Sequence, residues 1–304
     1  MSSLVFDRAL YRRRLGRALA AGYPDFLLAR CAGDLEERLS AVLRRFGLAA
    51  DLGSALPLAA PALRGKAEAV LRLAENPDAG GGSAADLIGD LEALPFAAAS
   101  LDLAASLLSL HAVNDLPGAL VQIRRSLRPD GLFIGCLLAG QSLTELRQVL
   151  LSAEVEATGG ASPRVAPFAD LRDLGSLLQR AGFALPVVDS ESVTVRYGDL
   201  FALLRDLRAM GWANALLERS RKPLRRSVLL RAAELYAERF SDPDGRLRAT
   251  FEIVWLSGWA PHESQQKPLR PGSAKARLAD ALGVPEIGTG EKPGGEKTGG
   301  EGER

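Results

Sequence analysis

The stretch from residue 101 to residue 138 constrains the fold more than any other part of this chain. It opens with a nearly continuous apolar run, Leu101 to Leu110, of the kind that fills a strand buried on both faces of a parallel sheet. Leu116 to Leu127 has the pattern of a helix with Pro117 in its first turn. The turn signal Arg128-Pro129-Asp130-Gly131 then leads into a second apolar strand, Leu132 to Leu138. Helix, turn and strand in this order are one half of a βαβ unit, the building block of parallel sheets.

Further helix and strand patterns lie on both sides of this unit. Asp34 and Glu37 have the spacing of a capping box, which predicts a helix before the core. Pro57 and Pro61 leave room for only a broken helix between the first two strands. In chain order, the other expected elements are a helix over 34–46, strands over 48–52, 67–73 and 85–89, helices over 142–156, 170–181, 199–219 and 223–240, and strands over 187–197 and 251–259. The alternation predicts an α/β fold with a doubly wound, Rossmann-like sheet, mostly parallel, with late antiparallel strands and added helices.

Length and composition favour a single elaborated domain. A chain of 304 residues with 47% hydrophobic content can bury one sizeable core. We expect an N-terminal helical segment over 1–46 and a main domain over 47–274, with helical insertions after residue 140. The stretch 76–83 is rich in Gly and is expected as a loop. Gly, Glu and Lys recur without an apolar period in residues 285–304, which predicts a disordered tail.

Charge and composition exclude several classes of function. The 38 Lys and Arg residues balance 37 Asp and Glu residues, so no global field directs the chain to nucleic acid or to an acidic membrane. Cys31, Cys136, His111 and His262 are isolated, a spacing that suits neither a zinc site nor a disulfide framework. No apolar run approaches the length of a membrane span, and no secretory h-region is present. These features predict a cytoplasmic protein without a structural metal.

A candidate cofactor loop follows the first predicted strand. Asp51-Leu52-Gly53 begins like a nucleotide-binding turn, but the next residues, Ser54-Ala55-Leu56-Pro57, are not the glycines that such a turn uses. A left-handed Ala55 would cost about 1–2 kcal/mol. Pro57 fixes φ and removes an N–H that would otherwise face a ligand. The loop must therefore take another shape or tolerate strain.

Several motifs together resemble a known family. They are Ser109-Leu110-His111-Ala112-Val113-Asn114-Asp115-Leu116-Pro117, Leu127-Arg128-Pro129-Asp130-Gly131-Leu132-Phe133-Ile134-Gly135, Thr144-Glu145-Leu146-Arg147, Gly159-Gly160-Ala161-Ser162-Pro163, Asp173-Leu174-Gly175-Ser176-Leu177-Leu178, Arg180-Ala181-Gly182-Phe183 and His262-Glu263-Ser264-Gln265. The first two resemble class I S-adenosylmethionine-dependent methyltransferases. The set resembles, more narrowly, the family of the respiratory complex I assembly factor that is built on this fold and is credited with hydroxylating an arginine of a complex I subunit. The resemblance covers most of the chain, from about Phe6 to about Ala274.

The resemblance implies S-adenosylmethionine as cofactor and assigns residues to it. Asp51 and Gly53 would open the first cofactor motif. Matching Ala74-Glu75-Asn76 to the family pattern puts Arg72 where an acid normally holds the ribose hydroxyls, and a guanidinium has no acceptor. Glu75 takes that role if the strand ends one turn later, and Arg72 would otherwise face an anionic nucleotide.

The adenine site and the catalytic position are assigned in the same way. Asp90 and Leu91 resemble the segment that holds the adenine amino group, although Asp90 also suits the cap of a turn. His111 lies just beyond the fourth strand, where it would act as a general base; the alternative is a histidine that satisfies local hydrogen bonds. Ala112 replaces a Trp that is usual in the family, which predicts a thinner pocket wall. Asn114 and Asp115 fit the start of a helix.

Three functions follow from this pattern. The first is an S-adenosylmethionine-dependent enzyme that modifies a protein substrate, as implied by the resemblance, with a complex I subunit as partner. The departures from the family pattern cluster in the half that recognises the cofactor, which favours a second hypothesis: an inactive relative that acts as an assembly or binding factor. The third is a methyltransferase of an acyl-carrier or small-molecule substrate. The Gly-poor loop at Ala55 to Pro57 puts cofactor binding in question, and a test of cofactor binding would distinguish the enzyme hypotheses from the binding-factor hypothesis.

Overall fold

The computed structural model describes residues 4–76 and 85–265. The described residues up to Glu263 belong to one compact unit. The loop predicted over 76–83, except for its first residue, lies outside the described residues. So do the end of the predicted main domain at residue 274 and the predicted tail over 285–304.

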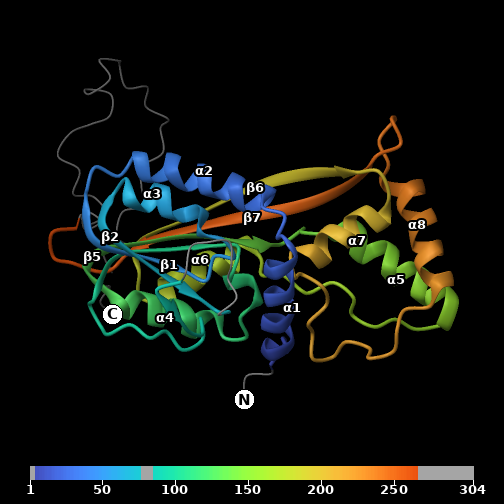
Figure 1. The fold of residues 1–304 in the computed structure, drawn as a ribbon, viewed down its shortest axis with the longest axis horizontal. Helices are drawn as coiled ribbons and strands as arrows, with labels where there is room; N and C mark the ends of the chain where they lie inside the picture. Colours follow the sequence, from blue (N-terminus) through green and yellow to red (C-terminus); the bar gives the residue numbers. More distant parts are fainter. Residues whose placement is uncertain (1–3, 77–84, 266–304) are drawn as a thin grey trace, which may run out of the picture. The chain divides into compact units, whose positions relative to one another are not determined.

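A seven-stranded sheet forms the centre of the unit (Figure 1). Its strands lie in the order β3-β2-β1-β4-β5-β7-β6. The parallel strands are β1 (Phe46–Leu52), β2 (Ala67–Ala74), β3 (Leu87–Ile88), β4 (Leu101–Leu107) and β5 (Leu127–Ala139). The antiparallel part comprises β6 (Ala184–Tyr197) and β7 (Leu247–Trp259), with β7 pairing to β5 and β6 pairing to β7. The predicted fold class is therefore confirmed. Strand β4 is buried at every residue, as its continuous apolar run requires.

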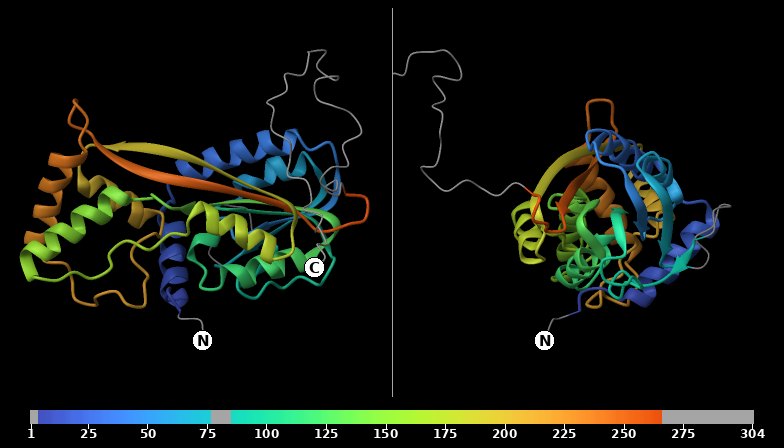
Figure 2. Two further views of the ribbon diagram at one scale, coloured as in Figure 1. Left: turned by 180° about the vertical axis from the view of Figure 1, so that it is seen from behind. Right: turned by 90° about the vertical axis from the view of Figure 1, so that its left-hand side faces the viewer.

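Helices cover both faces of this sheet, as the two views in Figure 2 show. One hydrophobic core lies under α2 (Phe26–Ser40) and α3 (Ala60–Arg64), with the short 3₁₀ helix η1 (Pro57–Ala59) before α3. The other lies under α4 (Leu116–Ser126) and α6 (Leu171–Arg180). The break between η1 and α3 agrees with the expectation from Pro57 and Pro61.

The long strands β5, β6 and β7 extend past the short parallel strands and carry a second group of helices. These are α5 (Thr144–Thr158), α7 (Leu200–Ala209) and α8 (Arg226–Phe240), which pack on β6, on β7 and on one another. Tyr236 of α8 is fully buried, and its hydroxyl donates to the Arg248 carbonyl at 2.8 Å. The chain after residue 140 therefore builds a wall beyond the carboxyl ends of the parallel strands.

Two elements differ locally from the sequence expectations. The helix expected over 34–46 is α2, which begins at Phe26 after Asp25, so the Asp34 and Glu37 spacing lies inside a helix. The turn signal Arg128 to Gly131 belongs to the irregular start of β5, where the pairing with β4 shifts register. Within the segment 1–46, which was expected to be helical, a further helix, α1 (Arg8–Ala21), begins at the Asp7 cap and crosses the carboxyl ends of the parallel strands (Figure 1).

The helix expected over 199–219 ends at Ala209, because the chain turns sharply at Gly211. Gly211 has φ +76°, and a Cβ atom there would lie 2.9 Å from Cα of Leu15 in α1. Only glycine combines this left-handed conformation with so close an approach of two backbones. The turn places the following residues, Trp212 to Asn214, against α1.

We predict that Gly211→Ala destabilises the fold by about 1–3 kcal/mol, because it adds left-handed strain and a steric clash with α1. Gly33→Ala is the matched control, since Gly33 is an exposed residue of α2 and a Cβ atom there would have no neighbour within 4 Å. That control is expected to be neutral or to stabilise by about 0.5–1 kcal/mol. Urea unfolding of the two variants measures both effects, and equal stabilities would contradict the role given to Gly211.

Candidate functional site

The predicted cofactor residues meet at the carboxyl ends of three adjacent strands. Asp51 lies near the end of β1, and Gly53 follows that strand. Glu75 is the first residue after β2, and Asp90 follows β3 by two residues. In a parallel sheet these ends share one edge, where open α/β folds bind their ligands. The five residues assigned from the resemblance therefore converge on one site.

Asp51 is a buried carboxylate with an unsatisfied oxygen. The residue is 1% exposed; its Oδ1 accepts a hydrogen bond from the Ser54 hydroxyl, and its Oδ2 is buried with no partner among the described residues. Burial raises the pKa of Asp51 to about 6, although Ser54 and the Arg72 guanidinium oppose the shift. Oδ2 is thus an acceptor available to a ligand donor.

Gly53 and Leu91 are in direct contact. Gly53 has φ +78°, and a Cβ atom there would lie 2.8 Å from Cδ1 of Leu91. Leu91 is 1% exposed, so it cannot move aside without opening the core. The one glycine that remains in the loop is therefore at the position where no other residue fits.

The structure corrects the position expected for Arg72. Arg72 pairs with Asp51 inside the sheet, two residues before the end of β2, and Glu75 is the first residue after that strand. The Arg72 guanidinium donates to the carbonyls of Ser54 at 3.1 Å and Ala55 at 3.0 Å. Arg72 therefore stabilises the Gly-poor loop through its carbonyls. This is the role that the structure gives Arg72, in place of the expected contact with a ribose or an anionic nucleotide.

Two arginines of α1 bind the two carboxylates that the resemblance assigns to ribose and adenine. Arg8 pairs with Glu75 and reaches Asp90 at 3.4 Å; Arg12 pairs with Asp90 and reaches Glu75 at 3.6 Å. We call these four residues the acid–arginine cluster. The Glu75 side chain is 1% exposed, and burial raises its pKa against the pull of both arginines. For Asp90 burial is opposed by the Glu92 amide and by Arg12, and the net effect is a lowered pKa.

The N-terminal segment is fastened to the same edge of the sheet. The side-chain oxygen of Asn114 accepts from the amides of Val5 at 2.8 Å and Phe6 at 2.7 Å, and Arg8 donates to the Ala112 carbonyl at 2.9 Å. Asp115 caps α4 through the Gly118 amide at 2.9 Å, as expected for a helix start. Asn114 therefore holds α1 in place rather than capping α4.

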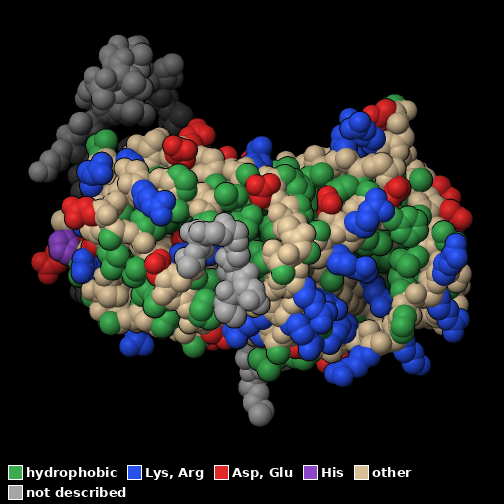
Figure 3. Space-filling model, in the orientation of Figure 1, with side chains coloured by type: hydrophobic (Ala, Val, Ile, Leu, Met, Phe, Trp, Pro, Cys, Tyr) green, Lys and Arg blue, Asp and Glu red, His purple; other side chains and the backbone are tan. Residues whose placement is uncertain are grey.

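A basic face surrounds the end of α7 and the neighbouring part of α1, and Figure 3 shows Lys and Arg side chains gathered beside α1. We define the basic face by Arg13, Arg14, Arg208 and Arg219. Burial lowers the pKa of Arg14, and the charges of the other three arginines add to that shift. Asp7 is the acid that opposes them, through an ion pair with Arg219 at 3.1 Å. The local charge is therefore positive although the whole chain is nearly neutral.

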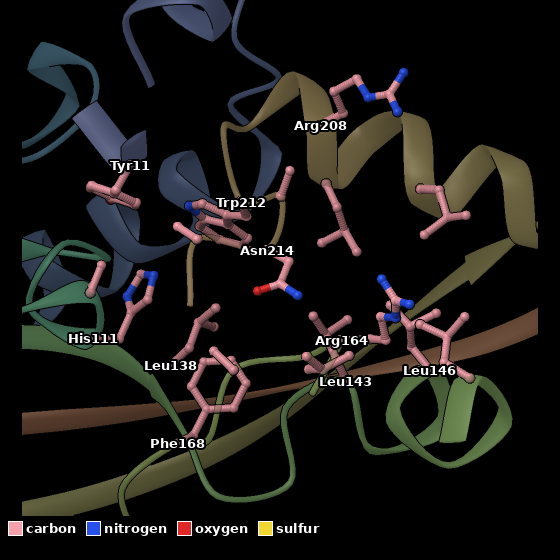
Figure 4. A pocket seen from close by; sticks show the side chains of 18 of the residues that line it. Tyr11, His111, Leu138, Leu143, Leu146, Arg164, Phe168, Arg208, Trp212 and Asn214 are labelled. Atoms are coloured by element: carbon pink, nitrogen blue, oxygen red, sulfur yellow. The ribbon is translucent and has the colours of Figure 1, made fainter. Parts of the chain in front are cut away.

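A cavity of about 440 Å³ lies between α1, α5, α7 and the segments that join them. Figure 4 shows its two ends. The aromatic end holds Tyr11, His111, Phe168 and Trp212, with the His111 ring centre 5.6 Å from Trp212 and 6.4 Å from Phe168. The aliphatic end is lined by Leu143, Leu146, Leu150, Leu204, Leu207 and Leu229, with Arg164 and Arg208 beside them. None of the five assigned cofactor residues lines the cavity.

His111 is the polar group at the aromatic end. Burial lowers its pKa to about 4, and the nearby Arg8 adds to the shift, so the ring is neutral at pH 7. Its Nδ1 is buried with no hydrogen-bond partner among the described residues. Ala112 lines the cavity too, and Trp212 provides an aromatic wall that sequence analysis did not assign. A neutral His111 is able to accept a proton or a hydrogen bond from a bound molecule.

Other site types find no support in the described residues. No group of three or more His, Cys, Asp or Glu side chains is placed to hold a metal ion in residues 4–76 and 85–265. Cys31 and Cys136 are buried free thiols. Within those same ranges, no helix has the length and apolarity required to cross a membrane.

Comparisons with known proteins place the chain in a family. A methyltransferase domain model matches residues 66–135. The zebrafish (Danio rerio) protein named arginine-hydroxylase NDUFAF5, mitochondrial, is 38% identical over 286 residues, which cover 91% of this chain and 89% of that protein. The human (Homo sapiens) protein of the same name is 39% identical and is covered to 83%. The chain belongs to the arginine-hydroxylase NDUFAF5 family.

More distant similarities agree with the methyltransferase fold of this NDUFAF5 family member. A malonyl-[acyl-carrier protein] O-methyltransferase of Laribacter hongkongensis is 38% identical over 183 residues, which cover 60% of this chain and 59% of that protein. A Bacillus halodurans structure assigned to the methyltransferases superposes with a TM-score of 0.52 at 13% identity, covering 76% of this chain and 99% of that one. The resemblance seen in the sequence is thus confirmed. The methyltransferase domain supports S-adenosylmethionine as the cofactor. The NDUFAF5 relatives are named mitochondrial, and the cytoplasmic location of this chain stays a prediction.

We predict that Asp51→Asn changes the pH dependence of stability. Because the folded pKa of Asp51 is raised from 3.8 to about 6, its stabilising contribution is full below about pH 4 and is lost as pH rises to about 6. The variant is expected to be about 1–3 kcal/mol more stable than the native chain at pH 7. In the variant the slope from Asp51 is absent, whereas that of His111 remains and has the opposite sign, because its lowered pKa makes stability rise with pH from about 4 to 6.5.

Urea unfolding between pH 4 and pH 7.5 measures these slopes. Asp25→Asn is the control, because Asp25 is exposed and its side chain makes no cap hydrogen bond to α2. If Asp51→Asn and Asp25→Asn give the same pH profile, Asp51 does not carry a raised pKa.

Proposed function

We propose that this chain binds S-adenosylmethionine at the carboxyl ends of β1, β2 and β3 and modifies a side chain of a protein substrate, an arginine of a respiratory complex I subunit. The observation that carries the proposal is the position of Arg8. One of its nitrogens bonds Glu75 in the cofactor site, and another bonds the Ala112 carbonyl, next to His111 at the cavity. The proposed cofactor site and the cavity that would hold the substrate side chain are therefore adjacent.

The acceptors present fit the cofactor. In this proposal Glu75 accepts from the ribose hydroxyls and Asp90 from the adenine amino group, and the unpartnered Oδ2 of Asp51 accepts from a donor of the methionine part. When bound, S-adenosylmethionine supplies an electrophilic methyl group. Because Arg8 and Arg12 now occupy Glu75 and Asp90, the cofactor has to share or displace these ion pairs.

The aromatic end of the cavity suits a guanidinium. Arginine stacks favourably on aromatic faces: Arg8 and Arg147 of the chain already lie over the rings of Tyr11 and Phe168, and Trp212 provides a further ring for a substrate arginine. His111 adds no charge that would repel a cation, because its lowered pKa keeps it neutral. Its free Nδ1 is then the group that accepts a proton or a hydrogen bond from the substrate.

Cofactor binding is tested by calorimetric titration of the full chain with S-adenosylmethionine. Glu75→Gln is expected to weaken binding about 10- to 100-fold, the value of one hydrogen bond to a charged acceptor. Glu68→Gln is the control, an exposed acid on the same strand, and is expected to bind like the native chain. No binding at millimolar cofactor, with retained capture of a complex I subunit, would favour the binding-factor hypothesis instead.

Modification is tested by mass spectrometry of complex I subunits after incubation with the chain and cofactor. His111→Asn is expected to lower the rate about 100-fold or more, the usual contribution of a general base, while leaving cofactor affinity unchanged. His262→Asn, at an exposed position outside the cavity, is the control. The mass gained distinguishes a methyl group from an oxygen atom. Modification of an acyl-carrier thioester but of no subunit would overturn the choice of a protein substrate.

A further inference from the structure

The aliphatic end of the cavity has no role in the function proposed above. Its walls come from three separate helices, with Leu146 and Leu150 on α5, Leu204 and Leu207 on α7 and Leu229 on α8. The whole cavity, about 440 Å³, lies within the range of about 300–1,000 Å³ that is usual for small-molecule sites. An apolar space of this kind favours an apolar chain over water.

The charges beside this end are positive. Arg208 lines the cavity and is exposed, and its side chain has no ion-pair or hydrogen-bond partner among the described residues. It belongs to the basic face with Arg14, whose guanidinium also holds the Ala213 carbonyl at 2.9 Å. Arg164 is already committed, because Glu154 binds it with both carboxylate oxygens. No Asp or Glu is among the described residues that line the cavity.

We propose that this end of the cavity is a binding site for a single-chain amphiphile, an acyl or alkyl chain that ends in a carboxylate or a phosphate. The chain lies among the leucines of α5, α7 and α8, and the anionic head lies at Arg208. The site needs neither the cofactor nor the protein substrate, so it goes beyond the function proposed above.

The head group and the chain make separable contributions. An anionic head group gains binding free energy from the unpaired positive charge of Arg208, whereas a neutral or cationic head group does not. Each methylene that leaves water improves affinity about threefold to fourfold, until the chain fills the aliphatic end. A site formed by both features therefore shows a dependence on chain length and on head charge together.

The test uses the full chain without S-adenosylmethionine and measures binding by calorimetry below the micelle concentration of each ligand. The ligands are octanoate, decanoate and dodecanoate for length, and decanoate, decyl phosphate, decanol and decylamine for head group. We expect affinity to rise about threefold to fourfold per methylene. Decanol and decylamine are expected to bind at least about 10-fold more weakly than the two anions, since they lack the charge-assisted contact. A preference between decanoate and decyl phosphate distinguishes a fatty acid from a phosphorylated chain.

Two variants locate the site, and one serves as control. Arg208→Glu is expected to weaken decanoate binding at least about 10-fold by reversing the charge at the head. Leu204→Trp fills the aliphatic end from a partly buried position and is expected to abolish the gain from decanoate to dodecanoate. Arg205→Glu is the control, since Arg205 is an exposed residue of the same helix that does not line the cavity. Melting curves without ligand show whether each variant is folded, and Arg208→Gln replaces Arg208→Glu if the latter is not.

Several outcomes would overturn the proposal. Equal affinity for decanol and decanoate removes the role of Arg208, and equal weakening by Arg208→Glu and Arg205→Glu places the ligand outside the cavity. Binding to vesicles of anionic phospholipid, without binding to any single-chain anion, assigns the basic face to a membrane surface. Binding of an acidic peptide alone assigns it to a protein partner. Because none of these measurements includes S-adenosylmethionine, their failure is distinct from failure of the proposed enzyme activity.

Discussion

The buried ion pair between Arg8 and Glu75 is the interaction on which the rest of the site depends. Glu75 is inaccessible to solvent, and a buried carboxylate without a partner destabilises a fold by several kcal/mol. Its position at the end of β2 is fixed by the sheet, so the compensating charge must come from another element. Helix α1 provides it, and the small cluster of Tyr11, Leu15, Ala112 and Ala215 adds apolar packing to the hydrogen bonds that hold α1 in place. The N-terminal helix is therefore an integral wall of the site.

This arrangement joins the cofactor site to the cavity through one side chain. Arg8 bonds Glu75 on one side and the Ala112 carbonyl on the other, and it lies over the ring of Tyr11 at 5.4 Å. Its charge also lowers the pKa of His111. A ligand that breaks the ion pair between Arg8 and Glu75 is expected to change the electrostatic potential at His111 and the position of the α1 residues that line the cavity. Cofactor and cavity ligand are thus expected to affect each other through α1, without any long-range path.

The sequence predicts those features that depend on local periodicity. The apolar runs and turn signals between 101 and 138 identify the sheet, and once strands are parallel their carboxyl ends share an edge. The meeting of Asp51, Glu75 and Asp90 follows from this. The partners of these acids do not follow, because Arg8 is 67 residues from Glu75 and 82 from Asp90 along the chain. A run of arginines has the same pattern whether it faces solvent or a buried acid. For the same reason Trp212, brought to His111 by the Gly211 turn, carries no local signal.

The cofactor loop has two unusual features, its lack of glycines and its buried Asp51, and their contacts show whether they support a degraded or a working cofactor site. The loss of glycines at Ser54 to Pro57 suggests a degraded site, yet Arg72 binds the Ser54 and Ala55 carbonyls and so gives the altered loop a fixed shape. Asp51 remains buried, with one oxygen unsatisfied and its pKa raised, a state that destabilises the fold at neutral pH. Replacement by an uncharged residue would relieve this cost in a chain that had no ligand for Oδ2. A loop held by Arg72 around an unsatisfied carboxylate therefore supports a cofactor site that is altered in sequence but still in use.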